Sequence, residues 1–300
     1  MVSKQMGYVI KGLFYNRSLE IKKRVQDHRK GLEVMTEGVK LPDDVKSELI
    51  DIDGLWCNLF FTPESKNDRI VLFLHGGAYI AGSVDTSKYH AVLISRFAKA
   101  QLLSVDYRLA PEDPFPAALD DTVKAYNWLM KEKKFTPNKI VIAGVSAGGG
   151  LTVATLLKLR DLGTKLPAAA VCISPWADLA FTGETFKARA NKDPFTTPHG
   201  LDFAANLYVK ENDPRNPFIS PVYADLQRLP PLFIIAGTAE ILYDDSIRLA
   251  ENAKSAGVEV ILDIWEDMIH AFPVFAKVAP ESQKAIEKIS NFIHDSFEHK

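Results

Sequence analysis

The sequence predicts an α/β protein with a mostly parallel central sheet of about eight strands and helices on both faces. Short apolar runs follow one another after residue 69, as expected of parallel strands buried on both sides. Stretches with helical periodicity lie between these runs. Nearer the start, an Asp-Gly pair separates two more apolar runs, which predicts an antiparallel hairpin. With 300 residues, 47% of them hydrophobic, the chain can bury one large core.

Residues 1–45 are expected to form a helical segment ahead of the sheet. Apolar side chains alternate with basic ones from Tyr8 to about Gly31, which suggests one or two amphipathic helices. Helices this short need another surface to cover. The main domain, residues 46–300, then opens with the hairpin, in which Asp53-Gly54 joins the runs 49–52 and 55–61.

The other strands and helices are expected to alternate along the chain. The expected strands are 70–74, 102–105, 140–143, 168–173, 232–236 and 258–264. The expected helices are 87–99, 117–133, 147–161, 243–256 and 282–297. Residues 179–221 break the alternation, because they are rich in Pro, Asn, Asp and Phe and contain one expected helix, 200–209. We interpret this segment as an insertion between strands, at a position where a cap could lie.

Composition narrows the classes of partner. Lys and Arg number 36 against 38 Asp and Glu, so the net charge of −2 gives no electrostatic reason to expect nucleic acid or an acidic membrane. Cys57 and Cys172 lie in apolar runs and are expected to be buried thiols, with no disulfide framework or metal cluster. No signal peptide or membrane span is evident, which makes a cytoplasmic setting the expectation. The oligomeric state is left open, a homodimer included.

The strongest local signal is Gly144-Val-Ser146-Ala-Gly148, which follows one apolar run directly and opens a helix. This is the context that a nucleophile elbow needs. The turn is so sharp that side chains at the two glycines would collide with the neighbouring strand and helix. A strained Ser146 would then hold its hydroxyl out near a helix N-terminus. A glycine-rich turn without chemistry is the alternative; a dinucleotide or P-loop pattern does not fit the residues that follow.

A second motif, His75-Gly-Gly-Ala78, comes immediately after the expected strand 70–74. Attack on an ester carbonyl makes an oxyanion, and each preorganised amide that binds it is worth about 2.7–4 kcal/mol. The amides of Gly76 and Gly77, with that of Ala147, are predicted to do this, while His75 is expected to brace the loop. The alternative is an ordinary tight turn. The presence of the elbow in the same chain favours the oxyanion hole.

The base and the acid follow from chain order, which in this arrangement is Ser, acid, His. Among the histidines, His270 stands just past the last expected strand and is the predicted base. The acid that orients the imidazole should follow the strand 232–236. Glu240 in that loop is the prediction, and Asp244 stays open as its rival. Asp267 lies too close to His270 in the chain to orient it.

Three motifs resemble those of the hormone-sensitive-lipase-like esterases, the bacterial family IV carboxylesterases of the α/β-hydrolase fold. They are His75-Gly-Gly-Ala78, Asp106-Tyr-Arg-Leu-Ala-Pro-Glu112 with Pro114-Phe-Pro-Ala-Ala118, and Gly144-Val-Ser-Ala-Gly-Gly149, in matching order between Ile70 and Phe272. The resemblance implies a triad of Ser146, an acid and His270, and an oxyanion hole of Gly76, Gly77 and Ala147. It also implies a cap formed by the N-terminal helices and residues 179–221, and a structural role for the 106–118 motif.

The resemblance further implies hydrolysis of short- to medium-chain carboxylic esters through an acyl-enzyme on Ser146, with a small-molecule ester as partner and no cofactor or metal. Some relatives open lactones, and the sequence is also similar to the branch with monoterpene lactone hydrolases, although no single motif carries that similarity. Val145 and Glu240 stand where many members have aspartate. An amidase or peptidase, and a non-catalytic small-molecule receptor, are the alternatives. The filled triad positions and the resemblance favour an esterase.

Overall fold

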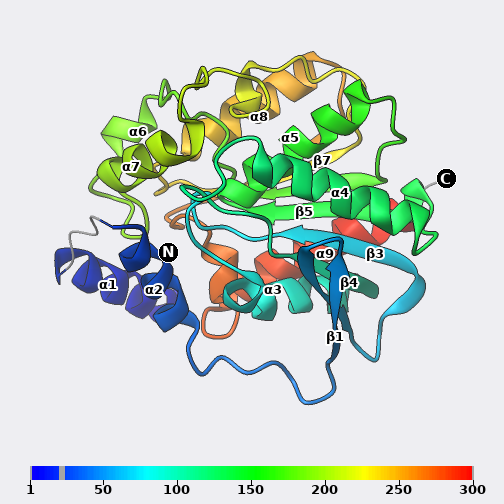
Figure 1. Cartoon of the computed structure of the whole chain (residues 1–300). Helices are drawn as coiled ribbons and strands as arrows, with labels where there is room; N and C mark the ends of the chain where they lie inside the picture. The colour runs from blue at the N-terminus through cyan, green and yellow to red at the C-terminus, as the bar shows by residue number, and fades with distance from the viewer. Residues whose placement is uncertain (1, 20–23, 299–300) are drawn as a thin grey trace.

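The computed structural model of the chain describes residues 2–19 and 24–298. Its centre is an eight-stranded sheet with the order β1-β2-β4-β3-β5-β6-β7-β8 (Figure 1). The strands are β1 (Lys46–Ile52), β2 (Leu55–Phe61), β3 (Lys66–Leu74), β4 (Ala100–Val105), β5 (Ile140–Val145), β6 (Ala169–Ile173), β7 (Leu232–Gly237) and β8 (Val260–Trp265). β2 pairs antiparallel with β1 and β4, and the other pairs are parallel. The predicted fold class is confirmed.

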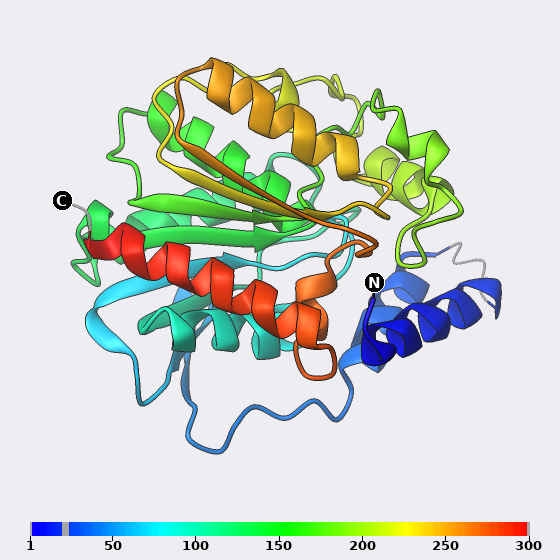
Figure 2. The ribbon, with the colours of Figure 1, turned by 180° about the vertical axis from the view of Figure 1, so that it is seen from behind.

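Helices cover both faces of the sheet. The helices of the described residues are α1 (Lys4–Leu19), α2 (Val25–Thr36), α3 (Val84–Phe97), α4 (Ala117–Lys131), α5 (Ala147–Asp161), α6 (Thr185–Ala188), α7 (Pro198–Val209), α8 (Tyr243–Ser255) and α9 (Pro280–Glu298), with short 3₁₀ helices at Pro137–Lys139, Pro221–Tyr223 and Phe272–Phe275. α3 and α9 lie on one face, and α4, α5 and α8 on the other (Figure 2). Along β3, Ile70 and Leu72 join one core cluster and Val71 and Phe73 the other, which explains the unbroken apolar run.

The hairpin prediction is confirmed. β1 and β2 pair in register up to Ile52 opposite Leu55. Asp53 and Gly54 in the turn both have positive φ, 48° and 86°, as a two-residue turn matching the strand twist requires. Cys57 and Cys172 are free and buried, also as predicted.

Some boundaries differ from the prediction. α3 begins at Val84 instead of residue 87, because Ser83 and Thr86 form a reciprocal capping box that starts the helix one turn earlier. The N-terminal helices begin before Tyr8 and extend past Gly31 to Thr36. α6 was not predicted; its single turn forms where the amide of Thr185 donates to a carboxylate oxygen of Asp244, 2.9 Å away in another part of the chain.

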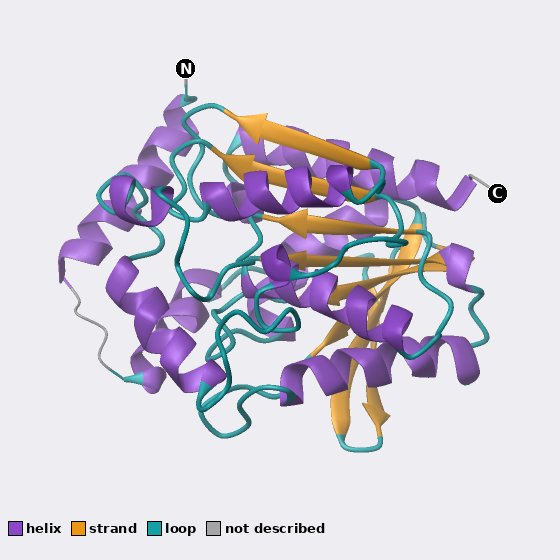
Figure 3. Ribbon diagram, turned by 90° about the horizontal axis from the view of Figure 1, so that it is seen from above, coloured by secondary structure: helices purple, strands orange, loops and turns teal. Residues whose placement is uncertain are grey.

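α1, α2, α6 and α7 gather at the end of the molecule toward which the parallel strands point (Figures 2 and 3). The carboxyl ends of parallel strands are where α/β proteins place their ligand sites. Within residues 2–19 and 24–298, no helix is both long and apolar enough to cross a bilayer.

Candidate active site

Ser146 lies between the last residue of β5 and the first residue of α5, in a backbone conformation that few non-glycine residues adopt (φ 57°, ψ −118°). A Cβ on Gly144 would lie 2.1 Å from the carbonyl oxygen of Gly148, and one on Gly148 would lie 2.2 Å from that of Leu74. The collisions expected from the sequence are therefore real. The strain is held in place because the amide of Ser146 donates to Ile173 of β6 at 2.8 Å.

The structure brings Ser146, His270 and Glu240 together from three different loops. Nε2 of His270 lies 2.8 Å from Oγ of Ser146, and Nδ1 lies 3.2 Å from Oε2 of Glu240. The other oxygen of Glu240 accepts from the hydroxyl of Ser174 at 2.7 Å and from the amide of Gly237 at 2.5 Å. Glu240 and His270 are completely buried, whereas Ser146 is 9% exposed. Only the serine end of this hydrogen-bonded line reaches toward solvent.

Burial and pairing act against each other on both ionisable groups. Burial lowers the pKa of His270, but the hydrogen bond and charge of Glu240 outweigh it, so this pKa is raised above its usual 6.5. Burial raises the pKa of Glu240, and hydrogen bonds from His270, Gly237 and Ser174 offset part of that rise. The two groups titrate as a coupled pair that holds a proton more readily than a free imidazole does.

The other acidic residues near Glu240 and His270 in the chain form hydrogen bonds with groups other than His270. Asp244 is in the first turn of α8, where its carboxylate accepts from the amide of Thr185 at 2.9 Å and thus faces α6. Its neighbour Asp245 accepts from two backbone amides of the loop after β6, and burial raises its pKa to about 8. Asp267 is exposed, and its amide donates to Thr238. Glu240 thus differs from these residues in the direction of its carboxylate, which points at His270, and not in its distance along the chain.

The loop after β3 supplies backbone amides next to Ser146. A Cβ on Gly76 would lie 3.4 Å from that of Ser146, and Gly77 has a φ of 127° that other residues rarely adopt. Within the described part of the chain, the amides of Gly76 and Gly77 donate to no acceptor. Ala147 is the first residue of α5, so its amide has no partner inside the helix. All three predicted oxyanion amides are therefore available.

His75 has contacts that suit a brace for this loop. Its Nδ1 lies 2.8 Å from the carbonyl oxygen of Gly76, and since a carbonyl only accepts, this nitrogen carries the proton. Its ring stacks on Tyr107 with centroids 4.1 Å apart, and the Tyr107 hydroxyl donates to the His75 carbonyl at 2.7 Å. Burial lowers the pKa of His75 to about 4, so the imidazole is neutral at pH 7. Tyr107 of the 106–118 motif thus packs against the loop, in line with the structural role that the resemblance implied.

The inserted segment contacts the acid loop in ways that sequence reasoning missed. The buried carboxylate of Asp193 accepts from the amide of Ile241, next to Glu240, at 3.0 Å. The guanidinium of Arg189 donates to the carbonyl oxygen of Thr238 in the same loop. The ring of Phe195 lies 5.9 Å from that of His270. The Asp-Pro pair at 193–194 marked a turn in the sequence, but no pattern there indicated contact with the acid loop.

Two aromatic residues, Tyr79 and Tyr208, belong to the hydrophobic core. Tyr79 and Tyr208 stack with ring centroids 3.8 Å apart, both buried, and so join the loop after β3 to α7. Phe203 of α7 stacks on His28, and Phe218 lies under the ammonium group of Lys158.

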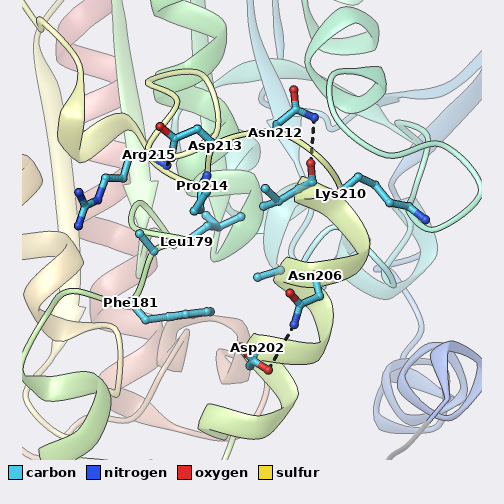
Figure 4. Close-up of a pocket in the computed structure, with 12 residues that line it drawn as sticks. Leu179, Phe181, Asp202, Asn206, Lys210, Asn212, Asp213, Pro214 and Arg215 are labelled. Carbon is cyan, nitrogen blue, oxygen red and sulfur yellow. Dashed lines mark hydrogen bonds between the residues drawn. The ribbon is translucent and has the colours of Figure 1, made fainter.

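A cavity of about 570 Å³ lies beside α7, and Ser146 is not among the residues that line it (Figure 4). Its walls combine the apolar side chains of Leu179 and Phe181 with the charged residues Asp202, Lys210 and Arg215. Among the residues that the structure describes, no group of three or more His, Cys, Asp or Glu side chains is arranged to hold a metal ion.

Comparisons with known proteins agree with the fold. Residues 71–274 match a family model described as the α/β hydrolase fold. An acetyl-hydrolase of Streptomyces hygroscopicus is 42% identical over 231 residues, 77% of each chain. An esterase of the bacterial hormone-sensitive lipase family superposes with a TM-score of 0.95 at 40% identity, covering 99% of both chains. The esterase EstE5, in a crystal soaked with p-nitrophenyl butyrate, superposes with a TM-score of 0.93 at 38% identity over 99% of this chain and all of its own.

Proposed function

We propose that this chain, which belongs to the α/β-hydrolase family and within it to the hormone-sensitive-lipase-like carboxylic ester hydrolases, cleaves esters through an acyl-enzyme on Ser146. One observation carries the proposal: an unbroken hydrogen-bonded line runs from Oγ of Ser146 through His270 to the carboxylate of Glu240. Such a line links a nucleophile to a base and the base to a group that orients it.

In the first half of the reaction, Nε2 of His270 removes the hydroxyl proton of Ser146 as Oγ attacks the ester carbonyl carbon. Glu240 holds the other ring nitrogen protonated and stabilises the imidazolium that forms. The amides of Gly76, Gly77 and Ala147 donate to the oxyanion. Collapse of the tetrahedral intermediate breaks the bond to the alcohol oxygen, which takes the proton from Nε2.

In the second half, a water molecule takes the place of the departed alcohol and loses a proton to Nε2 of His270 as it attacks the acyl carbon. The same amides bind the second oxyanion. Its collapse releases the carboxylic acid and returns the proton to Oγ of Ser146. Every bond and proton in these two half-reactions is supplied by the ester, by water, by Ser146 or by His270, so the proposed reaction needs neither cofactor nor metal.

Short- to medium-chain esters are the proposed substrates. An acetyl-hydrolase and an esterase soaked with a butyrate ester are among the similar proteins, and the name of the first and the soaked ester of the second both point to small acyl groups. We further propose that α1, α2 and residues 179–221 act as a cap that limits the acyl group. Its support is the position of these helices beyond the strand ends and the contact of Phe195 with His270. Lactones, as cyclic esters, would react by the same steps.

The test is turnover of p-nitrophenyl esters with acyl chains from acetate to laurate, beside a lactone panel and a p-nitroanilide. Ser146→Ala should lower kcat for the butyrate ester by about 10⁵-fold or more, because no nucleophile remains. Ser290→Ala is the control, since this serine is also buried but its hydroxyl donates to the carbonyl oxygens of Ile94 and Ile286. A fluorophosphonate probe should label the wild type and the control only. The proposal would be refuted if the probe labelled Ser146→Ala, or if this variant kept a few per cent of the wild-type turnover.

A further inference from the structure

We propose that Ser174 is a positioning residue that fixes Glu240 and the His270 loop in their reactive arrangement, an inference that rests on the proposed function. Ser174 directly follows β6 and is completely buried. Its hydroxyl is 2.7 Å from Oε1 of Glu240 and 3.0 Å from the amide of Ala271. One hydroxyl group therefore joins the loop that carries the acid to the residue beside His270.

The direction of both hydrogen bonds follows from their partners. An ionised carboxylate only accepts, so the hydroxyl proton of Ser174 points at Glu240. An amide only donates, so the Ala271 N–H points at a lone pair of the same oxygen. With its donor and an acceptor site used, the hydroxyl has no alternative orientation that keeps both contacts. From the end of β6, the hydroxyl thus links the loop after β7, which carries Glu240, to the loop after β8, which carries His270.

The contact selects which oxygen of Glu240 faces His270. Ser174 and the amide of Gly237 both donate to Oε1, which leaves Oε2 for Nδ1 of His270. A carboxylate held by two donors cannot rotate without losing both hydrogen bonds, and hydrogen bonds to charged groups are among the stronger ones in proteins. Ser174 thus fixes the rotation of the carboxylate that sets the position and tautomer of the imidazole.

The backbone of Ser174 is itself constrained. Its φ is 46°, in the left-handed region, and its amide donates to Ile235 of β7 at 2.7 Å. This conformation aims the side chain from the end of β6 toward the acid loop. Because strained non-glycine residues persist where the surrounding structure holds them, the conformation agrees with a role at the site.

Other negative charges also raise the pKa of His270. Besides Glu240, these are Asp193 of the inserted segment and Asp245 of α8. Asp193 accepts from the amide of Ile241, and Asp245 accepts from two backbone amides of the loop after β6, and none of these hydrogen bonds involves the hydroxyl of Ser174. The loss of its hydroxyl removes a donor from Glu240 alone, and the carboxylate then becomes more basic. The pair should take up its proton at higher pH.

The experiment compares Ser174→Ala, Ser174→Gly and the control Ser290→Ala with the wild type. For both Ser174 variants we expect kcat for p-nitrophenyl butyrate to fall about 10- to 100-fold, with KM changed less than about twofold. We also expect the acid limb of the kcat/KM profile to move to higher pH. Glycine adopts positive φ without strain, so Ser174→Gly separates loss of the hydroxyl from loss of the fold.

Two outcomes would overturn the inference. In the first, both variants keep wild-type kcat and the same acid limb; in the second, kcat falls only in proportion to the folded fraction measured by thermal melting. Either result would make Ser174 a structural residue. The proposed function would still stand if Ser146→Ala and Glu240→Gln remained inactive. Activity in Ser146→Ala would instead refute the proposed function itself, so the two failures are distinguishable.

Discussion

Replacing Glu240 with glutamine tests the proposed acid in a way that its neighbours make predictable. Two donors, Ser174 and the amide of Gly237, face Oε1 of Glu240. The glutamine oxygen should take that place, which puts the NH₂ group opposite Nδ1 of His270. That nitrogen must then accept, and the ring proton moves to Nε2. Nε2 could no longer remove the proton of Ser146, so the base would be held in the wrong tautomer.

The magnitude follows from the cost of escaping this arrangement. Turning the amide over would make its NH₂ group face two donors, and each buried group left without a partner costs roughly 1–3 kcal/mol. Two such penalties, about 2–6 kcal/mol, correspond to a fall of roughly 30-fold to 10⁴-fold. Loss of the negative charge that stabilises the imidazolium adds to this. We therefore expect Glu240→Gln to lower kcat about 10³- to 10⁴-fold.

The assay is steady-state hydrolysis of p-nitrophenyl butyrate, with thermal melting to confirm that each variant is folded. Asp244→Asn is the matched control, because Asp244 was the rival acid and its carboxylate faces Thr185 instead of His270. It should keep kcat within about threefold of the wild type. If Asp244→Asn loses activity while Glu240→Gln keeps it, the reasoning about the acid is refuted.

Two further predictions concern pH and the elbow. Glu240 raises the pKa of His270 against the effect of burial, so the imidazole becomes protonated, and therefore inactive as a base, at a higher pH than usual. As the pH is lowered, kcat/KM should therefore fall with an acid limb above pH 6.5, and a limb below 6.5 would contradict this. Gly148→Ala should destabilise the protein by more than about 3 kcal/mol in urea unfolding, since its Cβ would lie 2.2 Å from a backbone oxygen. Gly12→Ala in α1, with open space around it, should instead gain up to about 1 kcal/mol, and equal effects at both sites would refute the steric argument.

Local patterns in the sequence carried most of the fold. From Ile70 onward β3 has only apolar side chains, and β5 and β7 have only apolar side chains or glycine, because helices cover both faces of the sheet. The turn at Asp53-Gly54 was equally clear, because few residue pairs adopt two successive positive φ angles. The start of α3 and the presence of α6 were not predicted correctly. α3 begins at a capping box that has Thr86 where Glu or Gln is usual, and α6 depends on a hydrogen bond to the distant carboxylate of Asp244.

The residues of the candidate site also differ in how far local sequence patterns predict them. Ser146 was identifiable because the elbow needs glycines at fixed spacing, and His270 because chain order left it beyond the last strand. The choice between Glu240 and Asp244 was not identifiable, since they are four residues apart and both acidic. It depends on the direction in which the chain leaves β7, and that direction is set by contacts with α6 and Asp193.

The sequence by itself therefore determined the order of strands and helices, the nucleophile elbow and the loop of candidate oxyanion amides, because each depends on residues adjacent in the chain. Only the tertiary structure decided which carboxylate meets the imidazole and which hydroxyl holds that carboxylate. Ser146 and His270 are 124 positions apart, and Ser174 and Glu240 are 66 apart. These residues come into contact because β5, β6, β7 and β8 are neighbours in the sheet and end on the same side of it. No local spacing of residues encodes that arrangement.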